Sequence, residues 1–328
     1  MRTVRFLLLA AGAALFVALV VGIGPGAITA SFSELSWRLL VILIFPFSLI
    51  TLFDTLGWRF AFRRDGVPFR ALLSTRMAGE AFNATTPTAS VGGEAVKAWL
   101  LRPYVALDES LPSVIVAKTT ITIAQALFLL LGLLVAWPLL PAESPLLRGM
   151  QWLLVLEIVA VGGFVLVQMV GVLGGGGRIL ERLGVLGSGG GAHALGRVDQ
   201  GLSRFYREEP RRLLLSTACH FLGWALSAAE AYVILYLLGL PVSITTAVII
   251  EAFGAGIRFV SFMVPAHLGA LEGGQVATFA ALGLGAPAGL TFSLVRRVRE
   301  AAWTGAGLLV LAAVRPALPP RDAIQPEV

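Results

Sequence analysis

The sequence predicts an all-α polytopic membrane protein, built as an inverted repeat with two re-entrant broken-helix hairpins. Of its 328 residues, 57% are apolar and only 13% are charged, and the mean hydropathy is +0.86. Soluble domains carry about 25% charged residues, so this chain lacks the polar side chains needed to cover a soluble surface. Its apolar residues fall in long runs, which fit helices that satisfy their backbone groups inside a bilayer.

Composition also excludes several functional classes. One cysteine, Cys219, rules out a disulfide framework. The net charge of +6 fits arginines at a membrane rim better than a nucleic-acid partner. The sequence holds no His/Cys cluster and no nucleotide, zinc-protease or serine-hydrolase motif, so we expect no metal, no cofactor and no enzymatic activity.

Six apolar runs predict simple membrane spans. The first follows a short basic N-terminus, and its length favours an uncleaved span over a signal peptide. The expected spans cover about 6–23, 37–57, 111–136, 151–173, 213–238 and 288–314.

Two further segments, 71–103 and 244–285, resist interpretation as simple spans. The first contains Asn83-Ala-Thr-Thr-Pro87 and Val91-Gly-Gly-Glu94, and the second is rich in glycine and interrupted by proline. Such density of helix breakers at membrane depth is tolerated only where the backbone is buried in protein or lines a cavity. We therefore expect two re-entrant elements.

Residues 174–212 predict a cytoplasmic segment between the two halves. A Gly-rich linker at 174–191 precedes an amphipathic helix at 193–212. Leu195, Val198 and Leu202 share one face of that helix, and the arginines lie largely elsewhere. A basic helix of this kind is expected on the anionic inner leaflet.

Basic residues predict the orientation. With the N-terminus inside, cytoplasmic segments hold 18 of the 25 Lys and Arg residues, and outer loops hold only Arg38 and Arg148. Positive residues concentrate on the cytoplasmic side of membrane proteins. Both termini are therefore expected in the cytoplasm.

The two broken elements resemble each other in their anchors. Glu80-Ala-Phe in the first corresponds to Glu251-Ala-Phe in the second, and in each element a proline precedes a glutamate by seven residues. Three spans separate the copies, and an odd number inverts the second. We therefore predict one transmembrane domain over 1–328, with repeats at about 36–136 and 213–314, the architecture of secondary transporters.

Each repeat also spaces a glutamate and a cation identically. Glu94 precedes Lys118 by 24 residues, and Glu272 precedes Arg296 by 24. Unpaired charges are costly at membrane depth, so these four side chains form either structural ion pairs or a substrate site. As a site, Lys118 and Arg296 would hold a phosphate, while the glutamates balance those charges, bind a cationic headgroup or carry a proton.

Other polar residues complete the candidate site. Glu300 follows Arg296 by four residues and is expected to neutralise it partly. Gly92 and Gly93 would let the backbone approach a ligand at the start of a half-helix, whose free N–H groups favour anions. Asn83 lies just before this break. Lys97 is expected nearer the cytoplasmic rim.

The pattern Asn83-x3-Pro87-x4-Gly92-Gly93-Glu94, together with Pro265-x6-Glu272, resembles the flippase-like transmembrane domain of lysyl-phosphatidylglycerol synthases and their stand-alone relatives, including members associated with hopanoid biosynthesis. Many members carry an arginine where this chain has Lys97, which keeps the charge but loses the bidentate fork. Members with a synthase domain carry it after this region, so no aminoacyl transfer is expected here.

The resemblance implies a bacterial inner-membrane protein that moves a lipid between leaflets. The expected substrate is a phospholipid, a hopanoid or a polyprenyl-linked lipid with a polar or anionic headgroup. The alternative is a non-transporting subunit that presents a lipid to a separate synthase or glycosyltransferase. No nucleic-acid partner is expected.

Overall fold

A computed structural model describes residues 37–86, 92–170, 191–240 and 243–314, with a few isolated positions between 14 and 26. Every regular element in these ranges is a helix, as the sequence predicts. The helices are α3 (Arg38–Ile44), α4 (Phe47–Phe60), α5 (Phe69–Thr85), α6 (Gly92–Leu100), α7 (Leu107–Ala136), α8 (Pro145–Val170), α10 (Gly191–Glu208), α11 (Pro210–Leu237), α12 (Ile244–Val260), the 3₁₀ turn η1 (Pro265–His267), α13 (Ala270–Ala281) and α14 (Ala286–Ala313).

Four apolar segments of the described chain are long enough to cross a bilayer: Leu40–Phe60, Leu107–Ala136, Pro145–Met169 and Pro210–Leu237. They match four expected spans and support a multi-pass membrane location. The span expected at 37–57 is interrupted, because Phe45 is extended before Pro46 and separates α3 from α4.

Both expected broken elements are interrupted helices. In the first, α5 ends at Thr85 and α6 begins at Gly92. In the second, α12 and α13 are separated by a turn in which Ala266 and His267 have φ of 52° and 53°, in the left-handed region. The inverted relation between the two repeats stays a prediction.

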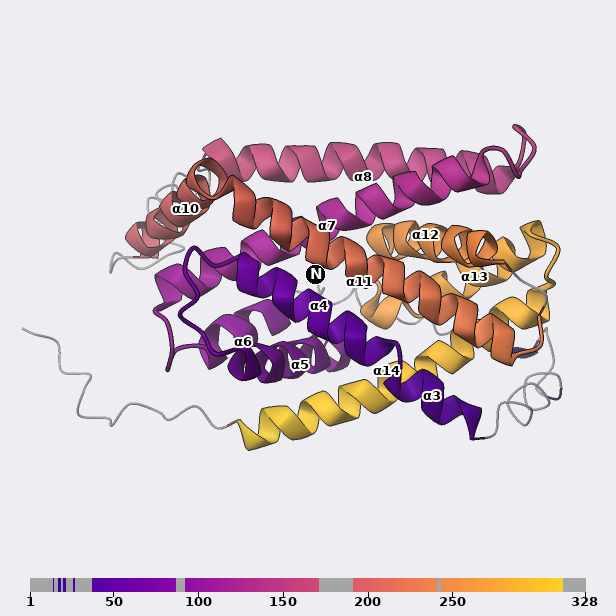
Figure 1. The fold of residues 1–328 in the computed structure, drawn as a ribbon, viewed down its shortest axis with the longest axis horizontal. Helices are drawn as coiled ribbons and strands as arrows, with labels where there is room; N and C mark the ends of the chain where they lie inside the picture. Colours follow the sequence, from indigo (N-terminus) through magenta and orange to yellow (C-terminus); the bar gives the residue numbers. More distant parts are fainter. Residues whose placement is uncertain are drawn as a thin grey trace, which may run out of the picture.

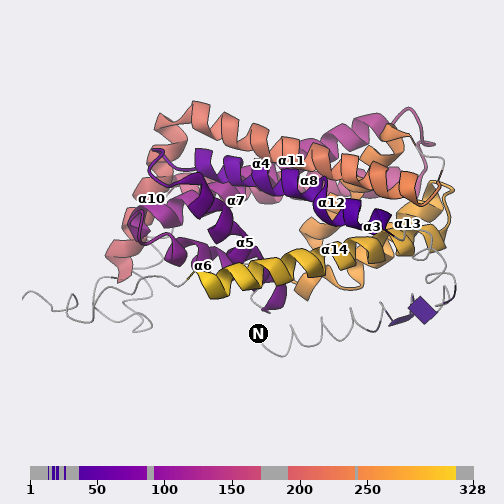
Figure 2. The same cartoon turned by 60° about the horizontal axis from the view of Figure 1, so that its bottom comes forward.

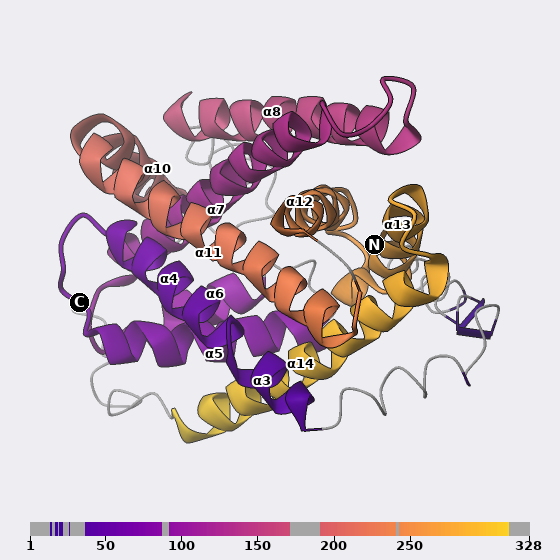
Figure 3. The ribbon, with the colours of Figure 1, turned by 45° about the vertical axis from the view of Figure 1, so that its right-hand side comes forward.

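The helices lie roughly along one long direction (Figure 1). The α4–α5 connection and α10 lie at one end, while the α7–α8 and α11–α12 connections lie at the other. In the rotated views, α5 is close to α14, and α12 lies beside α7 (Figures 2 and 3). Helix α4 packs along α11. The interior is therefore enclosed by helices from both halves of the chain.

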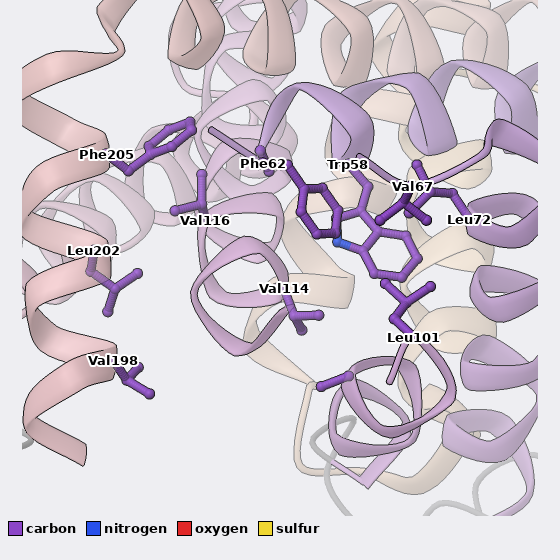
Figure 4. Packing of buried hydrophobic residues seen from close by; sticks show 12 residues of the cluster. Trp58, Phe62, Val67, Leu72, Leu101, Val114, Val116, Val198, Leu202 and Phe205 are labelled. Atoms are coloured by element: carbon purple, nitrogen blue, oxygen red, sulfur yellow. The ribbon is translucent and has the colours of Figure 1, made fainter. Parts of the chain in front are cut away.

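Helix α10 departs from its expected place and length. The expected helix at 193–212 ends at Glu208, and Pro210 starts α11, because proline cannot continue a helix. Its Val198, Leu202 and Phe205 are buried against α7 and the end of α4 (Figure 4). The apolar face that was expected on the lipid surface thus packs on protein.

Some predictions lie outside the described residues. These are most of the first span at 6–23, Pro87, most of the Gly-rich linker, and both termini.

Candidate functional site

Lys97 is the centre of a charged cluster formed by α5 and α6. Its ammonium contacts Glu80 Oε1 at 2.6 Å and Glu94 Oε2 at 3.1 Å. The side chain is only 6% exposed. Lys97 is therefore buried between α5 and α6, and its depth relative to the cytoplasmic rim stays a prediction. One turn of helix separates it from Glu94, so the pair forms within α6.

The glycines before Glu94 serve helix packing. A Cβ on Gly93 would lie 2.1 Å from the carbonyl oxygen of Gly79, and its own N–H donates to Asn83 Oδ1 at 2.7 Å. Gly93 therefore brings α6 against α5, and its N–H is not available to a ligand. At Gly93 the structure therefore shows a helix–helix contact where a ligand was expected. Asn83 accepts a hydrogen bond from a backbone N–H in the first turn of α6.

A second group of charges joins α4, α5 and α11. Asp54 accepts a hydrogen bond from Arg76 Nη2 at 2.8 Å and lies 2.9 Å from His220 Nδ1. Asp54 and His220 are both buried. No sequence spacing indicated this contact, since 166 residues separate the two partners.

The second half of the chain holds a larger buried network. Glu230 on α11 pairs with Arg299 and, at 3.2 Å, with Arg296. Arg296 reaches Glu251 on α12 at 2.5 Å, and Arg258 binds the other oxygen of Glu251 at 3.1 Å. The two glutamates are 1% exposed. Three helices are thus tied together by alternating charges.

Arg297 fixes the turn between α12 and α13. It contacts Glu272 at 2.6 Å and Glu300 at 3.1 Å, and it donates to the carbonyl of Ala266 at 2.7 Å. Glu272 also accepts from the N–H of Gly269 at 2.8 Å, which caps α13. Glu272 and Arg297 therefore stabilise together the left-handed turn that precedes α13.

These contacts correct the expected ion pairs. Glu94 pairs with Lys97 instead of Lys118, and Glu272 pairs with Arg297 instead of Arg296. The equal 24-residue spacings join residues on different helices, where the crossing geometry decides which side chains meet. Glu300 likewise contacts Arg297 and, at 3.6 Å, Arg299, not Arg296.

A cavity of about 360 Å³, here called the central cavity, lies between the two broken elements. Helix α5 contributes Glu80 and Asn83, and α4 and α14 close the sides. The turn after α12 contributes Phe262, Met263, Val264, Ala266 and His267. The lining mixes charges with apolar side chains. Its apolar members include Phe47, Ile50, Met77, Phe262, Met263, Leu271 and Trp303. This volume lies at the low end of the ~300–1,000 Å³ typical of ligand sites.

A second cavity of about 240 Å³ adjoins the first. Asp54, Arg258 and Glu300 line both cavities, so these charges stand at their boundary. Arg296 lines only this second cavity, among its buried ion pairs. The expected phosphate role of Arg296 is therefore weakened by two carboxylates already bound to it.

Lys118 lines neither of these two cavities. It is exposed and, within the described ranges, no carboxylate lies within 4 Å of its ammonium. It borders a small cavity with Glu80, Glu94 and Lys97. Lys118 thus remains a cation open to an anion beside the first cluster.

Sequence reasoning found the charged clusters but not all their members. The sequence did not assign Asp54, Glu230 or Arg258 to the site, and Glu251 served only as an anchor of the repeat. Arg76, which the sequence did not assign to the site, lies on α5 and lines the central cavity. The helical spacing of Arg76 and Glu80, at i and i+4, was the available signal.

A family model described as the lysylphosphatidylglycerol synthase TM region matches residues 4–306. Comparison with curated proteins found no match. Comparison with solved structures found none either.

Proposed function

We propose, from the premise that this chain belongs to the lysylphosphatidylglycerol synthase transmembrane family, that it moves a lipid with a polar headgroup between membrane leaflets. Membership supports a membrane domain that handles lipids. The further step to lipid movement rests on the shape and chemistry of the interior.

The central cavity carries this proposal. It places charged groups such as Glu80, Arg258 and Arg297 beside aromatic and aliphatic side chains. A lipid has the same division between a polar head and apolar tails. The headgroup would occupy the charged part of the cavity while the tails stay in the bilayer.

The packing of the helices supports alternating access. If the first repeat corresponds to α4–α7 and the second to α11–α14, the contact between α5 and α14 has its counterpart in the contact between α12 and α7. Helix α4 then packs on its own counterpart, α11. Transporters with such exchange symmetry open alternately by rocking one repeat against the other.

A blocking substitution tests the cavity as the route. We expect Ala84→Trp, which fills the lining at the end of α5, to abolish movement of acyl-labelled phospholipid in proteoliposomes, measured by dithionite bleaching. The matched control is Ala160→Trp on the exposed face of α8. Thr304→Phe blocks the same cavity from α14, which separates blocking from misfolding. Movement at the wild-type rate in both folded blocking variants would refute the route.

The second candidate is a non-transporting subunit that presents a lipid to a separate synthase or glycosyltransferase. The same cavity would hold the headgroup, without a change of leaflet. A purified chain that binds lipid, moves none, and isolates with a lipid-synthesis enzyme would favour this function.

The proposed location is the bacterial inner membrane with both termini in the cytoplasm. Basic side chains at one end of the fold support this orientation. Arg63 pairs with Glu208, and Arg212 pairs with Asp65, at the end that carries the α4–α5 connection. We propose no catalytic step and no cofactor.

A further inference from the structure

The charged side chains that line the central cavity have a net charge of zero. Three cations and three carboxylates line it, with His267 counted as neutral: Arg76, Arg258, Arg297, Asp54, Glu80 and Glu300. Their direct ion-pair partners outside the lining are two cations, Lys97 and Arg299, and two carboxylates, Glu251 and Glu272.

A balanced cavity restricts the charge of its occupant. A headgroup with a net charge would leave one charge unmatched at membrane depth, where an unmatched charge is costly. A headgroup that carries one anion and one cation keeps the balance. We propose that this cavity takes a lipid headgroup of zero net charge bearing both a phosphate and an ammonium group, an inference that rests on the proposed function.

Arg258 is the side chain placed to bind the phosphate. In the described part of the chain it makes one hydrogen bond, from Nη1 to Glu251, which leaves its other N–H groups for an acceptor. A guanidinium fork binds phosphate with two parallel hydrogen bonds. Arg258 also borders both cavities, so a phosphate held there can contact either.

Glu80 is the side chain placed to bind the ammonium. Among the described residues only its Oε1 has a protein partner, Lys97, and the side chain is 50% exposed. It lies on α5, across the lining from the α12 end that carries Arg258. A phosphoglycerol headgroup would offer this carboxylate only hydroxyl groups, whereas a phosphoethanolamine headgroup offers a counter-charge.

The test compares two lipids with identical acyl chains, one with phosphoethanolamine and one with phosphoglycerol. The purified chain is equilibrated with equal amounts in detergent, and bound lipid is quantified by mass spectrometry. We expect a preference of roughly tenfold for phosphoethanolamine. Glu80→Gln leaves the lining with one excess positive charge, so we expect the preference to reverse. Glu143→Gln, exposed in the α7–α8 connection, is the matched control and should keep the wild-type ratio.

A second variant adds charge without breaking an ion pair. Met263→Lys, in the turn after α12, also gives the cavity an excess positive charge with little change in side-chain volume, and it should shift binding toward phosphoglycerol even if Glu80→Gln does not fold. A wild-type chain that binds both lipids equally, or prefers phosphoglycerol, would overturn the inference. So would wild-type ratios in the folded variants.

Leaflet movement of the same two lipids in proteoliposomes separates this inference from the proposed function. A chain that selects phosphoethanolamine but moves no lipid refutes the proposed function and supports the headgroup assignment. A chain that moves lipid without headgroup preference supports the proposed function and refutes the headgroup assignment.

Discussion

Replacing Lys97 with glutamine should destabilise the protein far more than the same change at Lys118. Lys97 is 6% exposed and neutralises both Glu80 and Glu94. Without it, two carboxylates remain close together with no cation between them. Breaking a buried pair costs about 3–5 kcal/mol. Since Glu80 is half exposed, water relieves part of this cost, so we expect about 3 kcal/mol.

The assay is thermal unfolding of the purified protein in detergent, followed by intrinsic tryptophan fluorescence. A loss of about 3 kcal/mol predicts a fall in Tm of roughly 4 °C for a chain of this size. Lys118→Gln is the matched control, because Lys118 is exposed and pairs with no carboxylate of the described chain. Its effect should stay within about 0.5 kcal/mol, or roughly 1 °C.

A double variant sharpens the interpretation. Adding Glu94→Gln to Lys97→Gln removes one of the two unmatched carboxylates and should recover part of the lost stability. Equal melting temperatures for the Lys97 and Lys118 variants would refute the reasoning, since they would show that the Lys97 contacts carry no net stability.

Two further predictions concern packing and orientation. Gly93→Ala should destabilise by about 1–3 kcal/mol in the same melting assay, because its Cβ would meet Gly79. Gly305→Ala, with open space around its Cβ, should be neutral or stabilising by up to about 1 kcal/mol, and equal losses at both positions would contradict the packing argument. In intact cells, an impermeant thiol reagent should label Arg148→Cys but not Arg63→Cys, and the opposite pattern would invert the proposed orientation.

The helices could be predicted because hydrophobic run length and helix breakers are local signals. Apolar runs located α7, α8 and α11, and the density of glycine and proline located both broken elements. These features follow from the cost of exposing backbone in a bilayer, which acts on each segment separately.

The ion pairs could not be predicted because they depend on how helices cross. Consecutive residues on a helix point about 100° apart, so Arg296 and Arg297 serve different carboxylates on different helices. The contact between Asp54 and His220 joins α4 to α11 and leaves no trace in local spacing. The charged residues of the candidate site could therefore be predicted, but which cation pairs with which carboxylate depends on the three-dimensional fold.

The charges of α14 have a consequence for how this protein is made. This helix carries three arginines close together near its middle, Arg296, Arg297 and Arg299, and their carboxylate partners on α11, α12 and α13 are synthesised earlier. On its own, α14 is a poor substrate for membrane insertion, because each unmatched arginine near the bilayer centre costs about 2.5–3.5 kcal/mol on insertion scales. Partnered acids remove that penalty. Biogenesis should therefore be cooperative, with the preceding helices retained near the insertion machinery until α14 emerges and pairs with them.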